Sequence, residues 1–235
     1  MKRVLIITYY WPPSGGAGVQ RWLKFVKYLR SFNWEPIVFT VENGEFPVLD
    51  YDLIKEIPDG LEVLKVPAWE PYKMYKLFSG KNKNEGINSG FLSEKKGSSF
   101  VENISKWIRG NLFIPDARKF WIKPANQFLN QYLQNNPVDV IISSGPPHST
   151  HLIALSLKNT FQIPWFSDFR DPWTNIDFYK DLKLTKTADK KHKKLENDVL
   201  VQSDIVLTIG KQLSKELKTL GAKRVEIIEN GFDPQ

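Results

Sequence analysis

Seven short apolar runs rich in β-branched residues recur along the chain, with helix-like segments between them. Most of these runs are continuously apolar rather than alternating, which is typical of parallel strands covered by helices on both faces. Strand and helix alternate, so the sequence predicts an α/β fold with a doubly wound, mainly parallel sheet and right-handed crossovers. The seven runs are Val4–Thr8, Pro36–Val41, Leu61–Val66, Val138–Ser143, Ile163–Ser167, Asp204–Ile209 and Val225–Ile228.

Apolar residues at spacings of three and four mark one helical face from Val19 to Phe32. One sheet of this kind accounts for most of the chain, so we expect residues 1–235 to form a single domain. Two stretches, 68–99 and 175–194, break the alternation, and we interpret both as long loops. Helical periods return in Lys119–Leu133, Ser149–Asn159, Asp189–Gln202 and Lys211–Leu220.

Composition limits the classes of protein that remain. The absence of cysteine excludes a disulfide framework, a thiolate metal site and a cysteine nucleophile. No stretch approaches the roughly 18 to 20 apolar residues that span a bilayer, and the first apolar run is too short for a signal peptide. We therefore expect a soluble, cytoplasmic protein. A formal net charge of +7 favours an anionic partner, which could be phosphate, anionic lipid or nucleic acid. The alternative is that the charge only keeps the protein soluble.

A glycine-rich turn containing Gly15, Gly16 and Gly18 connects the first predicted strand to the first predicted helix. Ligands bind beyond the carboxyl ends of parallel strands, and glycines let backbone amides at a helix N-terminus approach an anion closely. The alternative is a tight turn that binds nothing. Neither standard phosphate loop fits: Arg21 replaces the third glycine of the dinucleotide fingerprint, and Val19 and Gln20 replace the Walker residues.

The opening strand, this turn from Tyr9 to Gly18 and the helix beginning at Val19 resemble retaining glycosyltransferases of family four. The ending from Val225 to Asp233 is similar to that family's Ile-x-Asn-Gly-x-Asp junction. Members have the GT-B architecture of two facing Rossmann-like domains. The resemblance covers nearly the whole chain and is weakest over residues 68–99.

By this resemblance the chain is the N-terminal, acceptor-binding domain of a hexosyltransferase. The C-terminal domain that grips the nucleotide-sugar is absent from the chain, so the chain alone is expected to be inactive. The implied reaction moves a sugar from a nucleotide-sugar donor to a glycan or lipid-linked acceptor, in bacterial surface polysaccharide biosynthesis. No cofactor or metal is expected, because the resemblance implies the metal-independent chemistry of GT-B enzymes. Gly15 and Gly16 would lie near the donor phosphates.

Further site candidates follow the ends of two predicted strands. His148 could orient a sugar hydroxyl or donate to a phosphate, unless its turn only caps a helix through Ser149 or Ser144. Asp168 could bind acceptor hydroxyls and Arg170 could neutralise phosphate charge, unless they form an internal ion pair. Many family members have a histidine where this chain reads Ser-Asp-Phe-Arg-Asp from residue 167, so no catalytic residue is assigned.

An aromatic stripe and a lysine-rich segment are candidates for a surface that meets the acceptor or a membrane. Trp69, Tyr72 and Tyr75 recur every three residues, which on a helix forms a stripe that either packs on the core or faces a partner. Lys190 and Lys191 belong to a run that either attracts lipid phosphate or is simply solvated. Peripheral contact with the inner face of the membrane is therefore an open alternative to a purely cytoplasmic location.

Two other functions remain open. A nucleotide-binding oxidoreductase domain would explain the fold but not the incomplete glycine fingerprint. A non-catalytic module that binds anionic surfaces would explain the charge. Aromatic and basic residues do not interleave in any nucleic-acid motif, so we expect no nucleic-acid partner.

Overall fold

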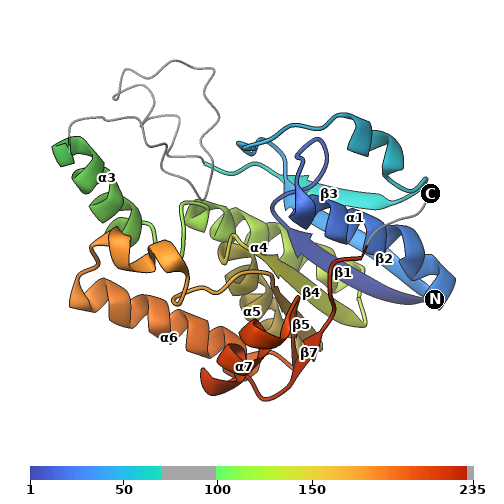
Figure 1. Ribbon diagram of the computed structural model, residues 1–235. Helices are drawn as coiled ribbons and strands as arrows, with labels where there is room; N and C mark the ends of the chain where they lie inside the picture. Colours follow the sequence, from blue (N-terminus) through green and yellow to red (C-terminus); the bar gives the residue numbers. More distant parts are fainter. Residues whose placement is uncertain (70–98, 232–235) are drawn as a thin grey trace.

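The computed structural model describes residues 1–69 and 99–231. In this part of the chain, seven parallel strands form one sheet in the order β3-β2-β1-β4-β5-β6-β7 (Figure 1). The predicted parallel α/β fold is therefore confirmed, and each predicted run overlaps one strand. The strands are β1 (Lys2–Thr8), β2 (Trp34–Val41), β3 (Glu62–Val66), β4 (Val140–Gly145), β5 (Trp165–Phe169), β6 (Ile205–Thr208) and β7 (Val225–Ile227).

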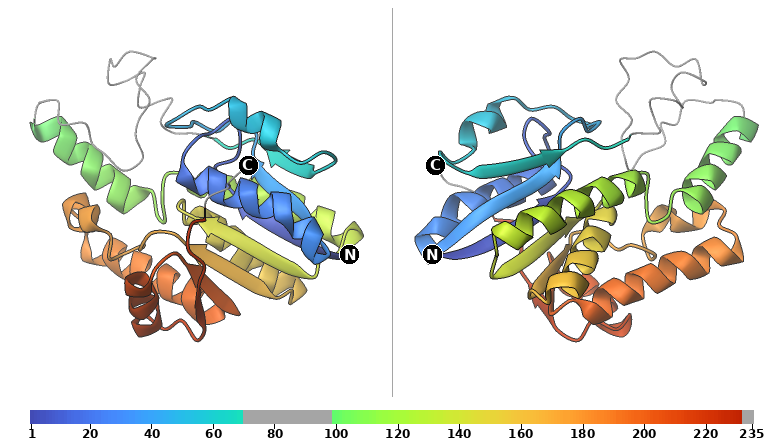
Figure 2. Two further views of the ribbon diagram at one scale, coloured as in Figure 1. Left: turned by 45° about the vertical axis from the view of Figure 1, so that its right-hand side comes forward. Right: turned by 180° about the vertical axis from the view of Figure 1, so that it is seen from behind.

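Helices cover both faces of the sheet, as the continuous apolar runs predict. In β1, Val4 and Ile6 pack with α1 on one face, whereas Leu5 and Ile7 pack with α4 and α5 on the other (Figure 2). The helices are α1 (Ala17–Leu29), α3 (Ser99–Leu112), α4 (Lys119–Asn135), α5 (Ser149–Phe161), α6 (Lys186–Gln202) and α7 (Lys211–Thr219), with short 3-10 turns η1 (Arg30–Phe32), η2 (Asp52–Glu56) and η3 (Asp177–Leu182).

The strand order reverses at β1, which pairs with β2 on one side and β4 on the other. At such a switch point the loops after the neighbouring strands turn to opposite faces and leave a crevice at the carboxyl edge of the sheet. The predicted substrate- and phosphate-binding residues lie at this edge, in the loop after β1 and the start of α1, in the loop after β4, and at the end of β5 and just beyond it.

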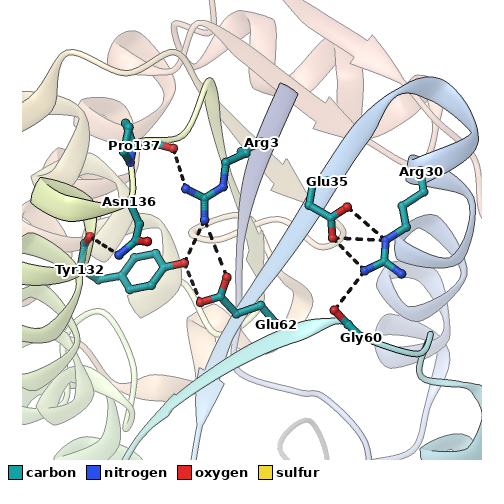
Figure 3. A network of polar contacts seen from close by, with 8 residues as sticks. All are labelled: Arg3, Arg30, Glu35, Gly60, Glu62, Tyr132, Asn136 and Pro137. Atoms are coloured by element: carbon teal, nitrogen blue, oxygen red, sulfur yellow. Dashed lines mark hydrogen bonds and ion pairs between the residues drawn. The ribbon is translucent and has the colours of Figure 1, made fainter. Parts of the chain in front are cut away.

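The opposite, amino edge of the sheet is closed by a polar network (Figure 3). Arg3 in β1 donates to the Tyr132 hydroxyl at 3.2 Å, and that hydroxyl donates to Glu62 in β3 at 2.8 Å. Burial and the neighbouring Glu62 carboxylate raise the pKa of Tyr132 to about 12. Arg30 and Glu35 form a second, half-exposed ion pair at 2.8 Å. The Arg3 network joins β1, β3 and α4, and the Arg30 pair joins η1 to β2. Both lie far from the predicted site, and we assign them to stability.

One loop expectation is wrong in its second half. Residues 175–194 contain the short turn η3, and from Lys186 onward they are the first part of α6. Thr185 caps this helix by accepting from the Ala188 amide at 3.2 Å. Asp189 pairs with Lys193 four residues later at 2.8 Å, so charge pairing along the helix offsets the repulsion among its lysines. The other expected loop lies almost wholly outside the described residues.

Candidate functional site

Arg170 and Gly18 meet at the carboxyl edge of the sheet. Gly18 lies in the first turn of α1, and a Cβ added there would stand 1.8 Å from Nη1 of Arg170. Glycine is therefore required by close approach, because its φ lies outside the left-handed region. Nη2 of Arg170 donates to the Pro146 carbonyl at 3.0 Å, and its Nε is buried without a partner among the described residues. Burial lowers the pKa of Arg170, and Asp168 and Asp171 oppose this shift.

The N-terminus of α1 beside Arg170 is open. Gly16 occupies the N-cap with φ of 106°, and no side chain caps the first amides of the helix. A Cβ at Gly16 would meet nothing within 4 Å, whereas the Gly15 amide already donates to the Val48 carbonyl at 3.0 Å. The N-terminus of α1 thus combines three favourable features for an anion. These are the uncapped amides, the partial positive charge of the helix end and the guanidinium of Arg170. An anion fits this arrangement, with Gly16 and Gly18 closer to it than Gly15.

Asp168, two residues before Arg170, has a carboxylate whose oxygens are all hydrogen-bonded to buried side chains of the same chain. Arg21 donates to both carboxylate oxygens at 3.3 and 3.2 Å. The indole of Trp22 donates at 2.9 Å and the Ser144 hydroxyl at 3.0 Å. Asp168 is 0% exposed, so the internal ion pair considered from the sequence exists, but Arg21 rather than Arg170 is its cation. This geometry leaves the carboxylate no free face for an acceptor hydroxyl.

Arg21 also reaches the segment that follows the last strand. Its Nη1 donates to the carbonyl oxygens of Ile228 at 2.8 Å and Glu229 at 3.3 Å, and to Oδ1 of Asn230 at 3.1 Å. The residue that interrupts the dinucleotide fingerprint therefore joins α1, β5 and the end of the sheet through one buried guanidinium.

A cavity of about 280 Å³ has Pro146 in its wall, the residue whose carbonyl accepts from Arg170. Its walls are mainly aromatic rings and prolines, with charged side chains among them. They come from the loops after β1, β2, β4 and β5 and from α3, η3 and α6. Rings that contribute to the walls include Tyr10, Phe46, Phe113, Trp173, Phe178 and Tyr179.

His148 lines this cavity and is the predicted site residue most clearly directed to it. Its ring stacks on Trp173 with centroids 4.5 Å apart and planes 3° from parallel. The side chain is 8% exposed, and Nδ1 has no partner among the described residues. Burial, and then electrostatic interaction with His192 and Arg170, lower the pKa of His148 to about 3. The imidazole is therefore neutral near pH 7 and offers a buried nitrogen to a ligand.

The N-terminus of α5, directly after His148, is already occupied. Asp116 accepts from the Ser149 amide at 2.9 Å and from the Ser149 hydroxyl at 2.7 Å. The cap thus comes from a carboxylate 33 residues earlier in the chain, and Ser144 instead bonds to Asp168. Because the Asp116 carboxylate already occupies the N-terminus of α5, the uncapped N-terminus of α1 is the better site for the negative charge of a ligand.

Helix α6 fixes the cavity wall formed by the loop after β5. Nε2 of His192 lies 3.1 Å from the Gly110 carbonyl, and the Trp173 indole donates to Nδ1 at 3.2 Å. Because a carbonyl only accepts, His192 carries its proton on Nε2. Glu196 accepts from the Thr174 amide at 3.2 Å, and burial raises the pKa of Glu196. These two side chains lock the loop that carries Trp173.

Three residues of the site were not identified from the sequence: Arg21, Asp116 and His192. Arg21 was noticed only as a departure from a motif, and a buried arginine in the first turns of a helix could have suggested an internal partner. No local pattern marks Asp116 as a helix cap, because its partner Ser149 lies 33 residues later in the chain. His192 lies in the lysine-rich segment, which the sequence analysis interprets as a loop. On a helix, Ala188, His192 and Glu196 share one face because they are four residues apart, and this spacing is a signal for His192.

The surface candidates are only partly described. Trp69 follows β3 and is 54% exposed, with its ring 4.5 Å from that of Phe120. Tyr72 and Tyr75 lie outside the described residues. Lys190 and Lys191 are exposed on α6. No helix among the described residues is long and apolar enough to cross a membrane. In residues 1–69 and 99–231, no three His, Asp or Glu side chains gather as metal ligands would.

Comparison with known proteins gives fold relatives only. No family model and no curated sequence matches the chain. Sucrose-phosphate synthase from Thermosynechococcus elongatus matches with a TM-score of 0.58 at 12% identity, over 99% of this chain and 49% of that one. HepE from Anabaena, with UDP and glucose, matches with a TM-score of 0.50 at 13% identity, over 99% of this chain and 45% of HepE. UGT89C1 from Arabidopsis thaliana, with UDP-L-rhamnose, matches with a TM-score of 0.51 at 13% identity, over 100% of this chain and 53% of UGT89C1.

The chain thus spans about half the length of the solved structures that it matches. These neighbours are GT-B glycosyltransferases, and the likeness confirms the Rossmann-like half of that architecture as the fold of this chain.

Proposed function

We propose that the chain is the acceptor-binding half of a retaining glycosyltransferase that moves a sugar from a nucleotide-sugar to a glycan or lipid-linked acceptor. The observation that carries the proposal is the contact of Arg170 with Gly18 at the uncapped end of α1. It places a buried guanidinium and free helix amides beside an aromatic cavity. GT-B neighbours that bind UDP or UDP-sugars support a nucleotide-sugar as the donor.

In this reaction the bond from the sugar to the diphosphate breaks and negative charge grows on the departing phosphate. Arg170 and the amides near Gly16 and Gly18 would stabilise that charge, because they are already oriented and need no rearrangement. The Gly15 amide is used by Val48, so its part is to shape the turn. We assign no protein nucleophile or base, and the phosphate would help to take the acceptor proton.

The cavity would receive the acceptor. Rings such as Trp173 and Phe46 suit the apolar faces of a sugar, and neutral His148 can hydrogen-bond a hydroxyl without bringing charge. Asp168 would act indirectly. Held by Arg21, Trp22 and Ser144, it fixes the end of β5 and thereby the backbone of Arg170 two residues later. We expect the reaction in surface polysaccharide biosynthesis.

The test compares the full-length gene product with its Arg170→Gln variant on a panel of UDP- and GDP-sugars, measuring donor hydrolysis and transfer. Loss of one preorganised donor is expected to lower kcat by about 100- to 1000-fold. The control is Arg224→Gln, since the Arg224 side chain is exposed and donates to Glu226 at 2.9 Å. Turnover that is unaffected by Arg170→Gln would contradict the proposal.

A nucleotide-binding oxidoreductase is the alternative that the same protein preparation can test. Nicotinamide cofactors should bind no more tightly than free adenosine, because the third glycine that brings helix and pyrophosphate together is replaced by Arg21. Tight nicotinamide binding that Arg170→Gln abolishes would favour the oxidoreductase instead.

A further inference from the structure

Asp171 lines the cavity with a carboxylate that forms no hydrogen bond or ion pair with the described part of the chain. It directly follows Arg170 after β5, and its side chain is exposed. Its negative charge opposes the effect of burial on the pKa of Arg170, so the carboxylate lies near that guanidinium without pairing with it. A ligand in the cavity therefore meets an acceptor group whose hydrogen-bonding capacity is still available.

The loop that carries Asp171 is held on both sides of this residue. Before it, the Arg170 amide donates to the Gly145 carbonyl at 3.3 Å. After it, the Trp173 indole donates to Nδ1 of His192 at 3.2 Å, and the next amide donates to a carboxylate of α6. These contacts fix the backbone around Asp171 before any ligand arrives, so binding requires little ordering of the loop.

The other carboxylates near this position already have partners. Asp116, also in the cavity wall, accepts from the amide and hydroxyl of Ser149 at 2.9 and 2.7 Å. Asp168, the other carboxylate that acts on Arg170, is 0% exposed and held by buried donors. The sequence analysis gave the binding of hydroxyls to Asp168, but the geometry supports this role for Asp171.

The position of Asp171 matches the place that the reaction requires for the transferred sugar. We call Arg170 and the uncapped N-terminus of α1, with Gly16 and Gly18, the anion site. The transferred sugar is bonded to the phosphate before the reaction and to the acceptor after it, so it must reach both the anion site and the cavity. Pro146 belongs to both, because its carbonyl accepts from Arg170 and it lines the cavity. Asp171, near Arg170 and in the same wall, is placed to meet that sugar.

We propose that Asp171 selects the transferred sugar by accepting hydrogen bonds from its hydroxyl groups and by excluding sugars that carry an acid group. A carboxylate only accepts, so neutral hydroxyls satisfy it, whereas a second carboxylate brings two like charges together. The class of donor sugar is then a neutral hexose rather than a uronic acid. This inference rests on the proposed function, because it places the sugar by means of the phosphate at the anion site.

The experiment titrates the full chain with three phosphorus-containing probes and follows them by phosphorus NMR. The probes are inorganic phosphate, α-D-glucose 1-phosphate and α-D-glucuronic acid 1-phosphate. Glucose 1-phosphate should bind about tenfold more tightly than phosphate, because its hydroxyls bond to a charged acceptor. Glucuronic acid 1-phosphate should bind no more tightly than phosphate, and Arg170→Gln should weaken all three.

Asp171→Asn keeps the shape of the side chain and removes its charge. The preference for glucose 1-phosphate over glucuronic acid 1-phosphate should fall from about tenfold to about threefold or less. A purely structural role would weaken all three probes together and leave this ratio unchanged. The control is Asp181→Asn, since Asp181 is exposed on η3 and outside the cavity wall. Thermal unfolding should show every variant folded.

The outcomes separate this inference from the proposed function. Phosphate binding that depends on Arg170, with a ratio that Asp171→Asn leaves unchanged or that Asp181→Asn lowers equally, would overturn the role of Asp171 alone. An unaltered chain that binds none of the three probes would overturn the anion site, and with it both proposals.

Discussion

The guanidinium of Arg170 packs directly on the α-carbon of Gly18 at the carboxyl edge of the sheet, where Gly18 lies in the first turn of α1 and Arg170 directly follows β5. This contact makes Gly18 a direct probe of the position of Arg170. It also separates function from stability, because alanine is favoured over glycine in a helix by about 1 kcal/mol.

Gly18→Ala is expected to displace Arg170 while the free energy of unfolding changes by no more than about 1 kcal/mol. Transfer by the full-length protein should fall by roughly tenfold or more, since a displaced guanidinium no longer meets the phosphate. Kinetics and urea unfolding measure the two effects. Gly210→Ala is the control, because a Cβ there meets nothing within 4 Å; equal losses in both variants would contradict the assignment.

Asp168→Asn is expected to lower the free energy of unfolding by about 3 to 5 kcal/mol, because it leaves the buried charge of Arg21 without its partner. The side chains of Arg21 and Asp168 are 1% and 0% exposed. Urea unfolding of Asp168→Asn, Arg21→Met and the double variant measures their coupling. The exposed pair Lys55 and Asp52 provides the comparison, where Lys55→Ala should cost less than about 1 kcal/mol. Additive losses at Arg21 and Asp168 would show that the pair is not coupled.

Stability should decline as the pH falls below about 6.5. The folded pKa values of His148, His151 and His192 are all lowered by burial. The unfolded chain therefore takes up protons that the folded chain refuses, from about pH 6.5 down to the folded pKa, which for His148 is about 3. Each proton adds about 1.4 kcal/mol per pH unit to the slope.

His148→Phe tests this assignment, since phenylalanine keeps the stack on Trp173 and takes no proton. The variant should lose one proton from the pH slope of the free energy of unfolding, measured by urea titration between pH 4 and about 6. Glu196 has a raised pKa and acts in the opposite direction, but it contributes equally to both proteins. An unchanged slope would mean that His148 is protonated in the fold.

Tyr132→Phe should lower stability by about 1 kcal/mol and leave transfer unchanged. Its hydroxyl joins Arg3 and Glu62 at the amino edge of the sheet, remote from the loops that form the cavity. Thermal unfolding and the transfer assay together measure this. A fall in transfer without a fall in stability would show that the amino edge affects the site.

The strands were predictable because both faces of the sheet are covered, so each strand appears as an uninterrupted apolar run. One exception is the end of β4, where Ser144 and Gly145 continue the strand beyond the predicted run Val138–Ser143. Polar groups at this end of the strand are satisfied internally: Ser144 donates to Asp168, and Ser143 accepts from Trp165 at 2.9 Å. Polar residues therefore indicate a loop only where their hydrogen-bond partners are water molecules rather than other side chains.

The convergence of Gly18, His148 and Arg170 was also predictable, because loops after parallel strands meet at one edge. The buried partners that hold the site residues in place were not predictable. Arg21 and Asp168 are separated by 147 residues and Asp116 and Ser149 by 33, and no local pattern relates such positions. The cavity wall depends on α3 and η3, whose packing follows from His192 meeting Gly110 across 82 residues.

Arg21 has a consequence for the order in which the chain assembles. Its guanidinium bonds to residues 147 and 207 positions later in the chain, so the ion pair cannot close until β5 and the segment after β7 are in place. Contacts of such long sequence separation form late, after the loops between them have been closed. Until then both charges remain hydrated. Substitutions at this pair should therefore act mainly by speeding unfolding, with little effect on the rate of folding.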